Sequence, residues 1–70
     1  MHNRNLLNKL RTYIEASELA ILEMEKLRDY YFKEGHETLG NYQEHKIRGV
    51  RESLGWLEYY VPEIKKATCP

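Results

Sequence analysis

Two apolar stripes run along one predicted helix of this 70-residue chain, and they constrain its fold more than any other feature. Between Ile47 and Val61, apolar residues recur every three or four positions, as they do along one side of a helix. The first stripe consists of Ile47, Val50, Leu54, Leu57 and Val61. The second, here called the aromatic strip, lies about 110° from the first at about 100° per residue; it consists of Tyr42, Gly49, Trp56 and Tyr60. Each stripe needs its own packing surface.

A broad apolar stripe also occupies the first half of the chain, where no Gly or Pro occurs before Gly35. Its members, three or four positions apart, are Leu6, Leu10, Tyr13, Ser17, Ala20, Met24, Leu27 and Tyr31. The pattern predicts a first helix over about residues 5–34. Asn3 or Asn5 is the expected N-cap, and Gly35 the expected end, because glycine readily takes positive φ.

Gly, Asn and Pro residues place the remaining boundaries. Residues 35–40, GHETLG, are predicted to form a loop. Asn41, with Glu44 three positions later, resembles a capping box and predicts a second helix over 41–61. Pro62 is expected to end that helix, because its ring would clash with the carbonyl of Glu58. Residues 62–70 then form a tail with one short final turn.

These elements predict an all-α fold in which residues 1–70 form a single antiparallel helical hairpin. Facing positions sum to about 75 if the turn is short, so Met24 faces Val50 and Ile21 faces Leu54. The hairpin covers the first stripe and leaves the aromatic strip exposed. We therefore expect a homodimer that forms a four-helix bundle with coiled-coil packing; the alternative is a monomeric hairpin whose strip binds a different protein.

Gly49 lies in the middle of the aromatic strip, where a glycine costs about 1 kcal/mol relative to alanine. Close approach of another backbone, or a partner's ring seated over Gly49, would explain it. The alternative is that glycine is simply tolerated at this position because this face of the helix is exposed. The predicted partner-binding residues are accordingly Tyr42, Gly49, Trp56 and Tyr60.

A second candidate site is a polar cluster at the loop end of the hairpin, formed by Arg28, Tyr31, Gln43 and Lys46. Arg28 and Gln43 occupy positions where the stripes would carry apolar residues. Cations beside a tyrosine can hold a phosphate or carboxylate, which suggests a small-anion or nucleotide-like ligand. The alternative is a polar end to a small core, with Arg28 paired to Glu44.

The charge balance argues against nucleic acid or an anionic membrane as the main partner. Lys+Arg and Asp+Glu number 11 each, so the net charge is zero. A local basic patch of Lys46, Arg48 and Arg51 is interrupted by Glu44 and Glu52. No apolar run is long enough to span a membrane or to act as a secretory signal, which favours a cytoplasmic protein.

The reactive residues form no recognisable catalytic or metal-binding pattern. Cys69 is the only cysteine, so no disulfide framework can form. His36 and His45 are nine positions apart, without the spacing of a helical metal motif, and read as solvated histidines. Ser17 and Ser53 have no plausible His/Asp partner. We expect no enzyme activity, cofactor or metal, which leaves association as the means of stabilising so short a chain.

The layout of a long helix, a Gly-bounded loop and a Tyr/Gln-containing start to the second helix resembles the small hairpin chaperones of type III secretion needle subunits. It resembles phage-encoded hairpin inhibitors equally well. The resemblance is one of layout and carries over no functional residue. It implies an adaptor, chaperone or inhibitor, of the kind that phages and mobile elements encode, that binds itself and another protein.

Overall fold

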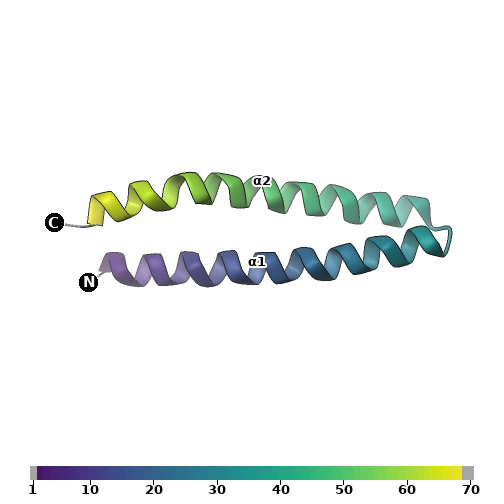
Figure 1. Ribbon diagram of the computed structural model, residues 1–70, viewed down its shortest axis with the longest axis horizontal. Coiled ribbons are helices and arrows are strands. Elements are labelled where there is room, and N and C mark those ends of the chain that lie inside the picture. Colours follow the sequence, from purple (N-terminus) through teal and green to yellow (C-terminus); the bar gives the residue numbers. More distant parts are fainter. Residues whose placement is uncertain (1, 69–70) are drawn as a thin grey trace.

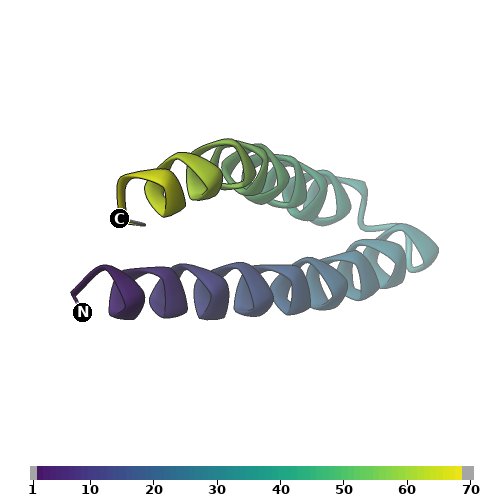
Figure 2. The same ribbon diagram turned by 60° about the vertical axis from the view of Figure 1, so that its left-hand side comes forward.

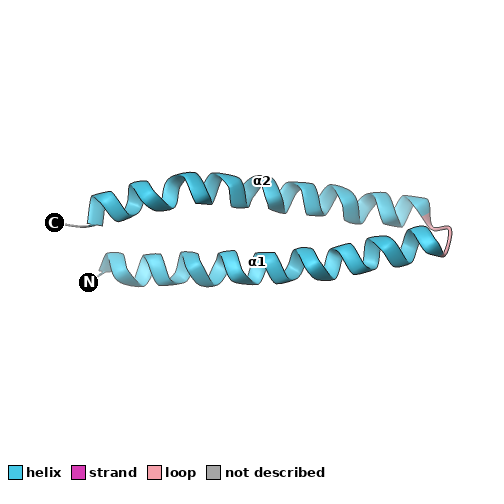
Figure 3. Cartoon of the chain, in the orientation of Figure 1, coloured by secondary structure: helices cyan, strands magenta, loops and turns pink. Residues whose placement is uncertain are grey.

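Two helices make up the described chain in the computed structural model, which describes the backbone of residues 2–68 and the side chains of residues 5–66. Helix α1 spans His2–Lys33 and helix α2 spans Glu37–Thr68. They lie side by side and antiparallel, joined by one tight turn (Figures 1 and 3). The Cα atoms extend over 55 × 16 × 11 Å. The predicted all-α helical hairpin is confirmed.

The turn is built around Gly35, as the sequence predicts. Its φ of +83° lies in the left-handed region, where glycine has no Cβ to clash. The His36 amide donates to the Tyr31 carbonyl at 2.8 Å, and the Gly35 amide donates to the Phe32 carbonyl at 3.2 Å. These two bonds form a Schellman motif, which satisfies the last carbonyls of α1.

The predicted loop over residues 35–40 is wrong, because α2 begins four residues earlier than Asn41. The Gly40 amide donates to the carbonyl of His36 at 3.0 Å, so His36 holds the N-cap position. Gly40 permits this early start. A Cβ there would stand only 2.6 Å from Cε1 of Phe32, so the missing side chain lets the ring lie against the first turn of α2.

The predicted end at Pro62 is also wrong, since α2 continues through Pro62 to Thr68. Proline removes one amide bond to the Glu58 carbonyl, but Glu58 is exposed and water can satisfy that oxygen. Val61 and Ile64 are half-buried on either side of the proline, and Val61 lines a groove together with Leu7 and Ile14 of α1. The predicted N-cap at Asn3 or Asn5 is also wrong, because α1 begins at His2 and both asparagines lie inside it. Cys69 lies outside the described residues.

The core is small and extends from the turn half of the hairpin to its middle. Among the described side chains, the buried apolar ones are Ile21, Met24, Ile47 and Leu54. Ile14, Val50 and Leu57 pack against them half-buried, which fits the predicted facing positions. Towards the chain ends, core positions such as Leu7 and Val61 stay half-buried. In both Figure 1 and Figure 2 the helices are farther apart there than beside the turn.

Candidate functional site

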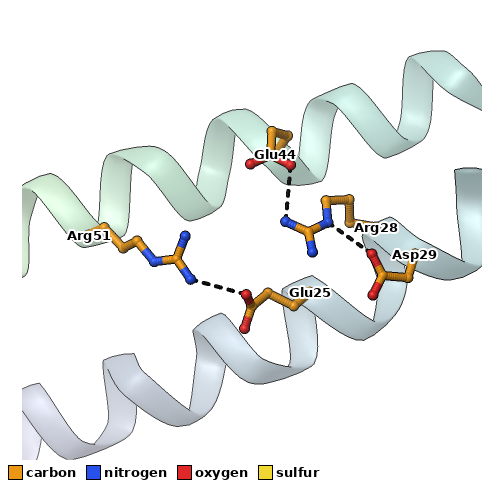
Figure 4. Close-up of polar contacts among 5 residues, drawn as sticks. All are labelled: Glu25, Arg28, Asp29, Glu44 and Arg51. Carbon is orange, nitrogen blue, oxygen red and sulfur yellow. Dashed lines mark hydrogen bonds and ion pairs between the residues drawn. The ribbon is translucent and has the colours of Figure 1, made fainter.

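The two broad sides of the hairpin differ in chemistry, and one of them is charged. Arg51 of α2 reaches across to Glu25 of α1, with 3.0 Å between Nη2 and Oε2 (Figure 4). Arg28 of α1 reaches Glu44 of α2, with 3.0 Å between Nη1 and Oε2, and its Nε lies 3.0 Å from Oδ1 of Asp29 (Figure 4). We call this the charged side.

The opposite side, here called the strip side, is apolar and open. A shallow groove of about 450 Å³ runs along it, lined by Leu10, Tyr13, Ser53, Trp56, Leu57 and Tyr60. Trp56 is 58% exposed even though it lines this groove. Sequence reasoning placed the strip on α2 alone and missed the contribution of α1. The signal was present, because Leu6, Tyr13, Ala20 and Leu27 recur every seven residues on the same side.

The aromatic strip residues lie where the sequence predicts, on the outer surface of α2. The rings of Trp56 and Tyr60 stack, with centroids 6.2 Å apart and an interplanar angle of 26°. The Lys46 ammonium lies 5.2 Å from the centre of the Tyr42 ring, as a cation–π pair. These contacts hold large rings in place on the surface, which lowers the entropy lost when something packs on them.

Gly49 has open space where its side chain would be. A Cβ built there meets no atom within 4 Å. Within the hairpin, therefore, nothing approaches Gly49 closely, and the glycine forms a notch in the middle of the strip. Gly55 has the same open surroundings but belongs to the charged side, where it lines a groove with Glu18, Glu25 and Glu58.

The predicted polar cluster at the loop end is divided between the two sides. Arg28 is directed to the charged side by Glu44 and Asp29, as its predicted pairing with Glu44 requires. The hydrogen bond to Asp29 raises the pKa of the Arg28 guanidinium, partial burial opposes this, and the bond to Glu44 raises it again. Lys46 instead lies over Tyr42 on the strip side.

The other two members of that cluster lie between the helices. Tyr31 is half-buried, with its ring edge-on to those of Tyr30 and His36 at 5.8 and 6.4 Å. Gln43 is 7% exposed, and its Oε1 has no hydrogen-bond partner within the described structure. The four side chains therefore do not converge on one pocket.

Comparison with known proteins assigns this hairpin to no family. The chain matches no model of a protein family, no curated protein and no solved structure. Among the described residues, no three His, Cys, Asp or Glu side chains are grouped where they could hold a metal ion. Over the same part of the chain, neither helix carries an apolar stretch of the length a membrane crossing needs.

The hairpin exposes more surface than a compact protein of its mass. Its accessible surface is 5792 Å², whereas a compact monomer of 8.4 kDa exposes about 4,600 Å². Twelve large apolar side chains are exposed among the described residues. Seven of them share the strip side: Leu6, Tyr13, Leu27, Leu39, Tyr42, Trp56 and Tyr60. This is the surface whose burial would stabilise an association most.

Proposed function

We propose that this chain is a non-enzymatic protein-interaction module, of the adaptor, chaperone or inhibitor kind, whose docking surface is the strip side. The observation that carries the proposal is the concentration of exposed aromatic and aliphatic side chains on one side of the hairpin, opposite a side held by ion pairs. Aligned apolar surface of this kind on a small protein is characteristic of an interface.

The occupant we propose is a helical surface, and a second copy of this chain supplies one. Two hairpins that pack strip side to strip side form a four-helix bundle, in which core positions left half-buried, such as Leu10 and Leu57, become enclosed. Burial of one large apolar side chain contributes about 1.5–3 kcal/mol, so a few such residues decide whether the bundle forms.

A small-anion or nucleotide-like ligand at the loop end has less support. Arg28 already pairs with two carboxylates, and Lys46 lies on the other side of the core. The basic patch is reduced in the same way, since Arg51 pairs with Glu25. No observation favours either of these sites over the strip side.

Removal of the largest exposed ring tests the proposal. Trp56→Ala should weaken self-association by about 100-fold or more, in keeping with the loss of a central aromatic anchor. Leu19→Ala is the matched control, because Leu19 is 64% exposed but does not belong to the strip side. Light scattering of each variant as it elutes from a size-exclusion column gives the masses of Trp56→Ala and Leu19→Ala. If Trp56→Ala has the same mass as the parent at every concentration, the strip side is not the docking surface.

A further inference from the structure

Gly49 and Trp56 carry an inference about how the second copy docks. They lie seven residues apart on α2. Seven residues make about two helical turns, so both residues lie on the same side of the helix. A Cβ built on Gly49 would meet no atom within 4 Å, which makes this position the notch, whereas Trp56 presents an exposed indole. A notch and a projection on one surface, separated by a whole number of turns, allow that surface to fit a copy of itself.

We propose that two copies dock strip side to strip side with their turns at opposite ends, so that Trp56 of each copy lies over Gly49 of the other. This rests on the proposed function, and it specifies the partner and its orientation. A two-fold axis that crosses α2 beside Ser53 produces both contacts at once, because the midpoint between Gly49 and Trp56 falls next to Ser53. Ser53 then faces its own counterpart, and its small side chain permits the close approach.

The charges on the strip side of α2 agree with this orientation. Lys46 precedes the midpoint and Glu63 follows it, with opposite signs. When the second α2 runs antiparallel, Lys46 of one copy comes within about one helical turn of Glu63 of the other. The side chain of lysine spans that distance, and the pair occurs twice by symmetry. A parallel α2 would place like charges at the same level.

Helix α1 fits the same axis. Ile21 and Leu54 share the core, so the axis that passes beside Ser53 crosses α1 near Ile21. Ala16 of one copy then faces Leu27 of the other, and the small residue again lies opposite a large one. Leu27 is 44% exposed in the single hairpin, so this contact has a side chain available to fill it.

The broad side is large enough for a stable dimer. Its Cα extents of 55 by 16 Å give a footprint of about 880 Å², and standard interfaces bury about 800 Å² on each partner. The surface that the hairpin exposes beyond a compact monomer of its mass is of the same order. No further chain is needed to cover the strip side.

Cysteine cross-linking tests the orientation. In the 70-residue chain with Cys69→Ser, Ser53→Cys should oxidise to a covalent dimer within minutes, because residues on a two-fold axis face each other at disulfide distance. Leu39→Cys is the matched control. Leu39 is also exposed on the strip side, but the proposed dimer places its two copies about 42 Å apart, 14 residues on each side of the axis. It should remain uncross-linked.

A pair of glycine variants tests the notch. Gly49→Gln fills it and should weaken the dimer by at least about 10-fold, with the Trp56 emission shifted towards that of a solvated indole. Gly55→Gln makes the same chemical change in equally open surroundings on the charged side, and should leave the dimer constant within about 2-fold.

The outcomes separate this inference from the proposed function. A parent chain that stays monomeric overturns both. A dimer that Trp56→Ala dissociates, but in which Ser53→Cys does not cross-link, retains the strip side as the docking surface and overturns the opposite-ends orientation. Equal effects of Gly49→Gln and Gly55→Gln overturn the contact between Trp56 and Gly49.

Discussion

Gly40 lies beneath the ring of Phe32, so closely that a Cβ on Gly40 would stand 2.6 Å from Cε1 and 2.7 Å from Cδ1 of that ring. The last turn of α1 and the first turn of α2 meet at this contact. It sets how near the helices approach beside the turn, and the core of Ile21, Met24, Ile47 and Leu54 extends from the turn half to the middle of the hairpin.

Gly40→Ala should therefore destabilise the hairpin by about 1 kcal/mol, even though alanine favours the helix, because overpacking outweighs propensity. In a Phe32→Ala background the same change should instead stabilise by about 0.5 kcal/mol. Urea denaturation of the four chains in this cycle measures the coupling. Stabilisation in both backgrounds would show that Phe32 does not restrict Gly40.

Gln43→Leu should raise the free energy of unfolding by about 1–2 kcal/mol. Gln43 is buried, its Oε1 has no partner within the described structure, and an unpartnered buried acceptor is costly. Thermal unfolding followed by circular dichroism gives the change. Gln43→Glu, which buries a charge at the same position, should act in the opposite direction. A loss of stability in Gln43→Leu would mean that the amide is satisfied in solution.

Glu58→Lys should stabilise the hairpin by a few tenths of a kcal/mol. Glu18 and Glu58 line the same groove on the charged side, as like charges on facing helices. About two helical turns nearer the turn, the corresponding positions hold the ion pair of Glu25 with Arg51. The substitution replaces a repulsion with an attraction between exposed groups, so the gain is small and should fade in high salt. Stability measured at two salt concentrations tests this, with Glu52→Lys as the control for the change in net charge.

Pro62→Ala should raise stability by up to about 3 kcal/mol without adding helix. Helix α2 already continues through Pro62 to Thr68, so alanine restores an amide bond in a helix that exists without it. Far-UV circular dichroism and denaturant unfolding give the two quantities. A clear increase in helix content would mean that the proline ends the helix in solution.

The sequence was sufficient for the hairpin and its core, because apolar residues spaced three and four apart define the side on which each helix packs. Ile14, Ile21 and Leu54 lie on these sides. It was insufficient for the turn. Nothing in Thr38, Leu39 and Gly40 taken alone distinguishes a loop from a helix start, and the deciding contact is that of Phe32 with Gly40, a property of the folded pair. Pro62 misled for a similar reason, since α2 continues through it, with Val61 and Ile64 half-buried on either side.

The candidate site was predicted in part. The exposure of Tyr42, Trp56 and Tyr60 follows from the helical wheel, because a single neighbour covers one stripe of α2. The share of the strip side that α1 supplies required both helices to be placed. The pairing of Arg28 with Glu44 was one of two alternatives left open by the sequence, and the 3.0 Å contact decides between them.

Sedimentation equilibrium of the unmodified chain at micromolar concentration tests the central claim, that a second hairpin covers the apolar strip side. We expect a particle of twice the 8.4 kDa chain mass that dissociates on dilution. A chain that sediments at 8.4 kDa up to millimolar concentration, with the Trp56 indole fully open to a soluble quencher, would contradict it.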